Sequence, residues 1–170
     1  MPRWAPFLRR HILTAIEREQ IAAALEEAGR HTRARIGLSI DDQATEDPQA
    51  RGHTLFRQWD LPDDERPTAV LVYVSARSRA FAVVGGDEVH RVAPRTFWEL
   101  VNQDLHHHFD EGRYCDGIFK AIAQVALQLE HDFPRPSEQR PEAPLGSWDA
   151  AAENPPGDAS GGPGSEYSQA

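Results

Sequence analysis

The middle of the chain contains a continuous run of apolar and mostly β-branched residues, Val70-Leu71-Val72-Tyr73-Val74. A strand that alternates apolar and polar residues can leave one face in water, whereas a strand that is apolar throughout has to be covered on both faces. The run therefore predicts a central strand in a layered fold, with other elements packed above and below it. Nowhere does the sequence approach the roughly 18 consecutive apolar residues of a membrane-spanning helix.

Alternating helices and strands are predicted around this central strand. Thr14 and Glu17 have the spacing of a capping box, which marks the start of an amphipathic helix. The predicted elements are a helix at 14–31, a strand at 36–40, a helix opened by Pro48, strands at 70–74 and 80–84 that form an antiparallel hairpin, a helix after Pro94 that ends at Gly112, and a last helix that Asp116 caps and that ends near His131. This order predicts an α/β fold, a three-layer α/β/α sandwich with a small mixed β-sheet and helices on both faces.

The composition changes sharply after Phe133-Pro134, where Pro, Gly, Ser, Glu and Ala become predominant. Such a segment cannot bury enough apolar area to offset the roughly 1–2 kcal/mol of backbone entropy that each ordered residue loses. We therefore predict an α/β domain over residues 1–134 and a disordered acidic tail over residues 135–170. The tail is predicted to be a solvated spacer; the alternative is a docking segment around Leu145-Gly146-Ser147-Trp148.

The charge and the cysteine content exclude several classes of protein. The 170-residue chain carries a net charge of −9, whereas nucleic-acid binding requires clustered Lys and Arg, so we expect no nucleic-acid partner. The single cysteine excludes a disulfide framework within the chain and a cysteine-rich zinc site. Because the N-terminus lacks the apolar segment of a secretion signal, we expect a cytoplasmic protein without direct membrane insertion.

Three patterns that could indicate catalysis have simpler interpretations. The triplet His106-His107-His108 cannot converge on one ion, because neighbouring positions on a helix point about 100° apart. The segment Asp41-Asp42-Gln43-Ala44-Thr45 approaches an aspartyl-phosphate motif, but Gln43 stands where magnesium binding needs a second carboxylate. Cys115 is followed by Asp116, which would oppose formation of a thiolate. The catalytic residues of this chain, if it has any, are therefore not identified by motif.

The glycine pair that follows the hairpin is the one remaining place in the sequence where we consider a cation site. Gly85-Gly86 permits backbone conformations with positive φ, and Asp87 comes directly after it. Together with Asp41 and Asp42 across the sheet edge, Asp87 would suit a hard cation such as calcium or magnesium. The residue types alone favour the alternative, a tight turn with solvated acidic side chains.

The order of the elements, together with Ala82-Val83-Val84-Gly85-Gly86-Asp87, resembles the TPM-domain family. Phe97-Trp98, Phe109-x-x-Gly112-x-Tyr114-x-x-Gly117 and Phe133-Pro134 match the same family, so the resemblance covers roughly residues 8 to 134. It implies an α/β/α sandwich and, in some members, an acidic calcium-binding cleft with weak acid phosphatase activity. The resemblance also implies that other members act as assembly or interaction modules.

This sequence departs from the family pattern beside the predicted cation site. Thr68-Ala69 stands where the family usually has Asn-Gly, and Arg35 stands where it usually has an acidic residue. A guanidinium in place of a carboxylate removes a charge that favours cations and adds an opposing one. We therefore predict a non-enzymatic protein-interaction or assembly module whose unidentified partner could be a membrane-anchored helical protein. The alternative is a divalent-metal-dependent acid phosphatase that binds its cation through Asp87, with Asp41 or Asp42.

Overall fold

The structure is a computed structural model that describes residues 12–136. The elements in chain order are α1 (Ala15–His31), β1 (Ile36–Asp41), α2 (Pro48–Gln58), the short 3₁₀ helix η1 (Arg66–Thr68), β2 (Val70–Ser75), β3 (Ala80–Gly85), α3 (Asp87–Val92), α4 (Arg95–Asp110) and α5 (Tyr114–Asp132). The tail predicted from residue 135 onward lies outside the described residues, except for Arg135 and Pro136. Arg135 still belongs to the packed domain, because its backbone N–H donates to the carbonyl of His31 at 3.1 Å.

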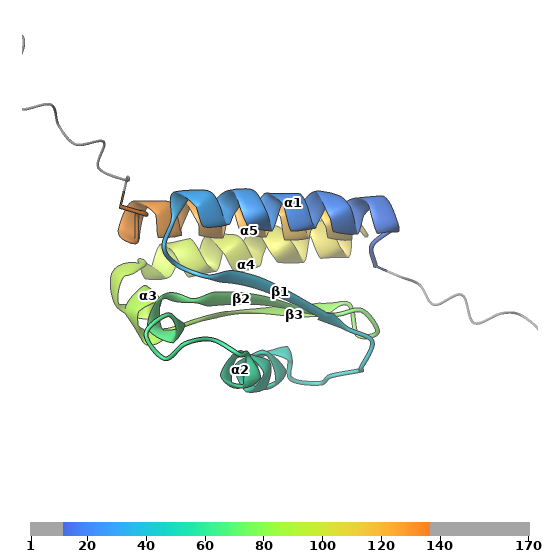
Figure 1. Ribbon diagram of the computed structural model, residues 1–170. Coiled ribbons are helices and arrows are strands. Elements are labelled where there is room, and N and C mark those ends of the chain that lie inside the picture. The colour runs from blue at the N-terminus through green and yellow to red at the C-terminus, as the bar shows by residue number, and fades with distance from the viewer. Residues whose placement is uncertain (1–11, 137–170) are drawn as a thin grey trace, which may run out of the picture. The chain divides into compact units, whose positions relative to one another are not determined.

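The three strands form one mixed sheet in the order β1-β2-β3, with β1 parallel to β2 and β2 antiparallel to β3. Helices α1, α4 and α5 cover one face of the sheet and α2 covers the other (Figure 1). This arrangement confirms the predicted α/β/α sandwich with a small mixed sheet. The strand registers define two ends of the sheet, which we call the Asp41 end (Asp41, Ser75 and Ala80) and the Gly85 end (Ile36, Val70 and Gly85).

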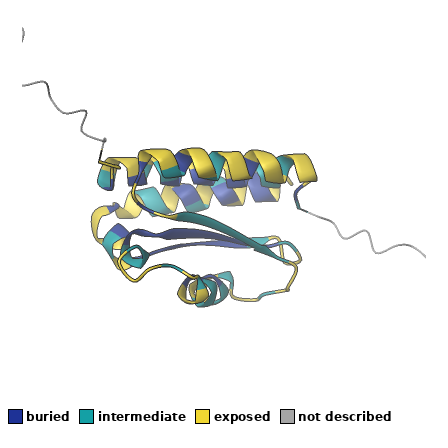
Figure 2. Ribbon diagram, viewed as in Figure 1, coloured by how far each residue is buried: buried dark blue, intermediate teal, exposed yellow. Residues whose placement is uncertain are grey.

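The central strand β2 is buried at every position, as its composition predicts (Figure 2). Its side chains alternate between two apolar cores, one under the three-helix layer and a smaller one under α2. Val72 is in the larger core, whereas Leu71 packs with Phe56 of α2 in the smaller one. No helix within residues 12–136 is long and apolar enough to cross a membrane.

Both ends of α1 follow the sequence signals closely. The Thr14 N–H donates to Glu17 Oε2 at 2.7 Å and the Glu17 N–H donates to Thr14 Oγ1 at 3.2 Å, which confirms the capping box. At the other end the buried Thr32 hydroxyl lies 2.6 Å from the Phe133 carbonyl. This contact ties the end of α1 to the end of α5.

The glycine pair after β3 has a different role from the predicted one. Residues 87–92 form the short helix α3 instead of an open turn, and Gly86, with a φ of −72°, is its N-cap. A Cβ on Gly86 would lie 2.3 Å from the carbonyl oxygen of Arg66 and 2.4 Å from that of Pro67. Glycine is therefore required here by the close approach of η1 and not by a positive φ.

The predicted cap of the last helix is also corrected. Gly112, with a φ of +73°, ends α4, and the Arg113 N–H then donates to the His108 carbonyl at 2.8 Å. The chain reverses so tightly that α5 begins at Tyr114 with Arg113 as its N-cap. Asp116 consequently lies in the first turn of the helix, where its negative charge is still favourable.

Candidate functional site

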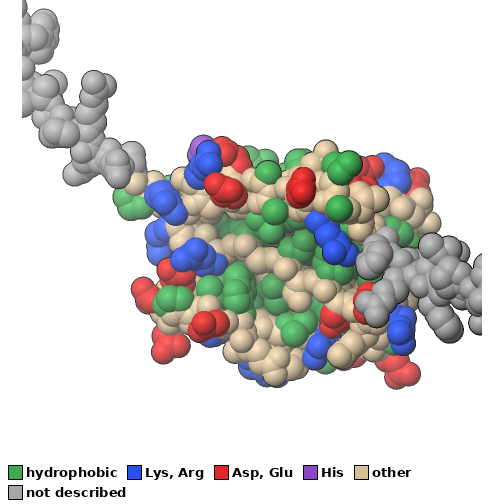
Figure 3. Space-filling model, turned by 45° about the vertical axis from the view of Figure 1, so that its right-hand side comes forward, with side chains coloured by type: hydrophobic (Ala, Val, Ile, Leu, Met, Phe, Trp, Pro, Cys, Tyr) green, Lys and Arg blue, Asp and Glu red, His purple; other side chains and the backbone are tan. Residues whose placement is uncertain are grey.

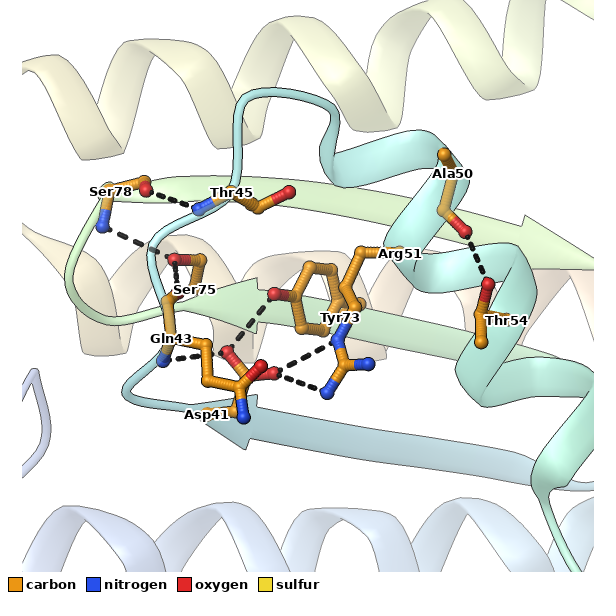
Figure 4. A network of polar contacts seen from close by, with 9 residues as sticks. All are labelled: Asp41, Gln43, Thr45, Ala50, Arg51, Thr54, Tyr73, Ser75 and Ser78. Atoms are coloured by element: carbon orange, nitrogen blue, oxygen red, sulfur yellow. Dashed lines mark hydrogen bonds and ion pairs between the residues drawn. The ribbon is translucent and has the colours of Figure 1, made fainter.

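The parallel strands β1 and β2 finish side by side at the Asp41 end of the sheet. In open α/β sheets the carboxyl ends of parallel strands are the usual position of a ligand. Asp41 is the last residue of β1, and its side chain points toward Arg51 of α2 and Tyr73 of β2 (Figure 4). These three side chains come from three different elements, and we treat them as the candidate site.

Both carboxylate oxygens of Asp41 accept hydrogen bonds. Oδ1 lies 3.0 Å from the Tyr73 hydroxyl and 3.3 Å from the Gln43 N–H, and both of these groups donate to it. Oδ2 accepts from Nε and Nη2 of Arg51, at 3.3 and 3.2 Å. A carboxylate held in this way by a guanidinium, a phenol and a backbone amide is neutralised and fixed in position.

The site is polar but largely shielded from water. Tyr73 is fully buried, whereas the side chains of Asp41 and Arg51 are 20% and 32% exposed. Burial raises the pKa of the Tyr73 phenol, the hydrogen bond and negative charge of Asp41 raise it further, and Arg51 partly opposes this effect. Tyr73 therefore serves the site as a neutral donor.

The loop after β1 is fastened to the β2–β3 turn. The Ser75 hydroxyl donates to the Gln43 carbonyl at 2.7 Å and accepts from the Ser78 N–H at 3.2 Å. The Thr45 N–H donates to the Ser78 hydroxyl at 2.8 Å (Figure 4). The segment that approaches an aspartyl-phosphate motif thus uses Gln43 and Thr45 in loop contacts.

The three carboxylates proposed for a cation lie in three separate places. Asp41 faces α2, whereas Asp42 is exposed and borders a groove between α1 and β1. Asp87 is exposed in the first turn of α3, beyond the Gly85 end of the sheet. Within residues 12–136, no three His, Cys, Asp or Glu side chains are grouped so that they could hold a metal ion. This donor set does not fit a divalent cation.

The residues that depart from the family pattern support the Gly85 end of the sheet. Arg35 donates to Glu65 Oε2 from Nε at 2.5 Å and to Oε1 from Nη2 at 3.2 Å, and this hydrogen bonding lowers the pKa of Glu65. The Thr68 hydroxyl donates to the Glu65 carbonyl at 3.1 Å. Ala69 is fully buried, and its carbonyl accepts the Gly86 N–H at 2.8 Å. These side chains make structural contacts among themselves.

The histidine triplet and the cysteine have individual surroundings. His106 packs against the ring of Phe81 at a centroid distance of 4.7 Å, and His107 Nε2 is 3.7 Å from a carboxylate oxygen of Glu111. His108 is almost buried, with Nδ1 2.7 Å from the Asp104 carbonyl. Burial raises the pKa of the Cys115 thiol, and the negative charges of Glu17 and Asp116 raise it further. A thiol in such surroundings is a poor nucleophile.

Two members of the candidate site, Arg51 and Tyr73, are not predicted by the sequence reasoning above. Their contacts with Asp41 depend on the register between β1 and β2 and on the packing of α2 across the sheet. The available signal is the phenol of Tyr73, the only hydroxyl within the run from residue 70 to 74. A buried hydroxyl needs a hydrogen-bond partner, and Asp41 is that partner.

Comparison with known proteins gives a family and a fold. The family model of the TPM domain matches residues 9–128. The BA42 protein of the psychrophilic bacterium Bizionia argentinensis is 22% identical with a TM-score of 0.66, over 74% of this chain and 86% of that one. The N-terminal domain of a P. gingivalis protein is 18% identical with a TM-score of 0.57, over 72% and 79% of the two chains. The search of curated proteins found no match. At these levels of sequence identity, the similarity to the solved structures shows a shared fold.

Proposed function

Because this chain belongs to the TPM domain family, we propose that it acts as a protein-interaction or assembly module and does not hydrolyse phosphate esters. The observation that carries the proposal is the state of Asp41, the carboxylate at the carboxyl end of the parallel strands. Its two oxygens accept four hydrogen bonds, two of them from the Arg51 guanidinium. The carboxylate therefore has a structural role in joining β1, β2 and α2.

The scattered arrangement of acidic groups also argues against a metal-dependent phosphatase. Calcium takes six to eight oxygen ligands, and magnesium takes six in strict geometry. Asp42 and Asp87 are single exposed carboxylates at different edges of the domain, and water competes well with one such ligand. Arg51 beside Asp41 adds a positive charge that opposes a cation there.

The surface of the sheet supports an interaction role. Strand β1 is an edge strand, and all six of its residues are only partly buried. Edge strands that are neither covered nor charged along their length are common sites of association with other chains. Here the one charged residue within β1 is Asp41, whose side chain is paired with Arg51.

The proposal is tested by measuring hydrolysis of p-nitrophenyl phosphate by the full chain between pH 5 and 7, with calcium, magnesium or manganese in turn. We expect no hydrolysis above that of the buffer. Asp41→Asn and Asp87→Asn are assayed beside the wild type, so that any contaminating phosphatase is recognised as activity that neither variant lowers. Cation-dependent hydrolysis that one of these variants abolishes would restore the phosphatase alternative.

A further inference from the structure

Among residues 12–136, no other strand pairs with the outer edge of β1. On the inner edge, the Arg35 carbonyl accepts the Val70 N–H of β2 at 2.8 Å. Because backbone groups of successive residues in a strand point alternately to its two edges, those of Ile36, Leu38 and Ile40 point away from β2. They form a row of donors and acceptors that another strand can pair with.

A groove with an apolar floor in its first part and a charged lining in its second part runs beside this edge, between α1 and β1. Its first part has a volume of about 490 Å³ and is lined by Leu13, Leu25, Leu38 and Ile40. The groove continues past Leu25 into a second part of about 560 Å³, which Ile36 borders. Figure 3 shows hydrophobic side chains in the central hollow of this face, with several Lys and Arg side chains at its left-hand end and another toward its right-hand end.

The two ends of the groove differ in charge. The part at the Asp41 end has one arginine and one aspartate in its lining, Arg18 and Asp42. The part at the Gly85 end has more arginines than acidic residues: Arg30 and Arg35 pair with Glu26 and Glu65, and Arg33 and Arg135 remain. Arg33 lies over the ring of Phe133 and Arg135 donates to a backbone carbonyl. Neither of these two arginines forms an ion pair with a carboxylate of residues 12–136. The Gly85 end therefore attracts negative charge, although the whole chain has a net charge of −9.

We propose that β1 and this groove bind an extended peptide of a partner protein, which joins the sheet as a fourth strand. The peptide runs antiparallel to β1, since antiparallel pairing is the more stable form. Alternate apolar side chains of the peptide pack on Leu38 and Ile40, and acidic residues toward its carboxyl end meet Arg33 and Arg135. This inference rests on the proposed interaction function and specifies the chemistry of the partner.

A second copy of the chain does not fit the same edge. In Figure 1, α1 runs along β1 on the core face of the sheet. Two β1 strands paired edge to edge would lie about 4.8 Å apart, whereas two packed helices need about 8–10 Å between their axes. The two copies of α1 would therefore collide, and a peptide without its own covering helix avoids this collision.

The probe is a displayed library of random peptides of about 12 residues, selected on the full-length protein. Ala22→Trp narrows the groove from the exposed side of α1, because Ala22 lines it. Ala23→Trp is the matched control, since Ala23 is also exposed on α1 but borders a different groove. Leu38→Pro removes an N–H that points outward and keeps those that bond to β2. Arg33→Glu reverses one charge at the Gly85 end.

We expect the selected peptides to carry alternating apolar residues followed by Glu or Asp. When these peptides are synthesised and titrated, Ala22→Trp and Leu38→Pro should weaken binding by about tenfold or more, and Ala23→Trp by less than about twofold. Arg33→Glu should weaken binding mainly at low salt. Bound peptide should also slow hydrogen exchange at the amides of Ile36, Leu38 and Ile40. Melting curves identify any variant that fails to fold. If Leu38→Pro or Arg33→Glu fails to fold, the comparison of peptide binding by Ala22→Trp and by Ala23→Trp decides the test.

Several results would overturn the inference. They are a failure to select any peptide, selected peptides that bind Ala22→Trp as tightly as the wild type, and a dimer of the full chain that Leu38→Pro dissociates. Peptides that bind at another surface would refute this site and leave the proposed interaction function standing. Phosphate-ester hydrolysis would refute that function, whatever the peptides do.

Discussion

At the Asp41 end of the sheet, the neighbours of one carboxylate determine what it can do. An aspartate at the end of a parallel strand is well placed for catalysis or for cation binding. Here Arg51 supplies the compensating charge, and Tyr73 supplies a donor that stays protonated. The same aspartate therefore contributes to packing between α2 and the sheet, and its location alone does not indicate chemistry.

The hydroxyl of Tyr73 should contribute measurably to stability. Tyr73→Phe keeps the buried ring and removes the hydrogen bond to Asp41. Because Arg51 and Gln43 still bind the carboxylate, we expect the free energy of unfolding in urea to fall by about 1–2 kcal/mol at pH 7. Tyr114→Phe, outside the network, is the control. A Tyr73→Phe variant as stable as the wild type would contradict the importance of this bond.

We also expect Tyr73→Phe to change how the stability of the protein depends on pH in the alkaline range. The pKa of Tyr73 is raised in the folded protein, mainly by burial. A raised folded-state pKa favours the protonated phenol, so its contribution is present below the unfolded pKa of about 10 and is lost as the pH rises through the folded pKa. The wild type should thus lose stability more steeply above about pH 10 than Tyr73→Phe. If the stabilities of the wild type and of Tyr73→Phe fell in parallel above about pH 10, this prediction would be wrong.

At the scale of the elements, the sequence predicts the helices and strands that have a clear period. The capping box of α1, the apolar run of β2 and the hairpin partner β3 depend on neighbouring residues, and each is found as predicted. Helix α3 is missed, because six residues are too few to display a helical period. The contact of Asp41 with Arg51 is missed for another reason, since it needs the register of two strands and the position of α2.

The close approach of η1 to Gly86, the N-cap of α3, can be tested by substitution. Gly86→Ala would place a methyl group 2.3 Å from the Arg66 carbonyl oxygen, and the overpacking should cost about 1–3 kcal/mol. Gly29→Ala is the control, because nothing lies within 4 Å of a Cβ there and alanine favours a helix by about 1 kcal/mol. In urea unfolding, we expect the free energy of unfolding to fall in Gly86→Ala and to rise in Gly29→Ala. A neutral Gly86→Ala would mean that η1 does not approach so closely.

At the scale of the whole molecule, the strand registers place far apart two aspartates that a motif search would assign to one site. Asp41 and Asp87 lie at opposite ends of one sheet, although in the sequence Asp41 ends one strand and Asp87 closely follows another. The family is recognisable from the sequence because its markers are mainly architectural glycines and aromatic residues, such as Gly86 and Trp98. The chemistry at the strand ends cannot be recognised from the sequence in this way, because it depends on which carboxylate contacts which arginine in the folded protein.

The segment beyond residue 136 should contribute little to the stability of the domain. Its composition offers few apolar side chains, chiefly Leu145 and Trp148. We therefore expect deletion of residues 137–170 to leave the melting temperature unchanged within about 2 °C. A larger decrease in a thermal melt would indicate that Leu145 or Trp148 packs on the domain.

The central claim is that the carboxylates of this domain are not available to a divalent cation, and thermal melting of the full chain tests it most directly. A cation that binds only the folded state adds about 2.7 kcal/mol at a hundredfold excess over its dissociation constant, which is a shift of several degrees. Melting temperatures are compared in EDTA and in millimolar calcium, magnesium or manganese. We predict no shift. A cation-dependent rise that Asp87→Asn or Asp41→Asn abolishes would contradict the account.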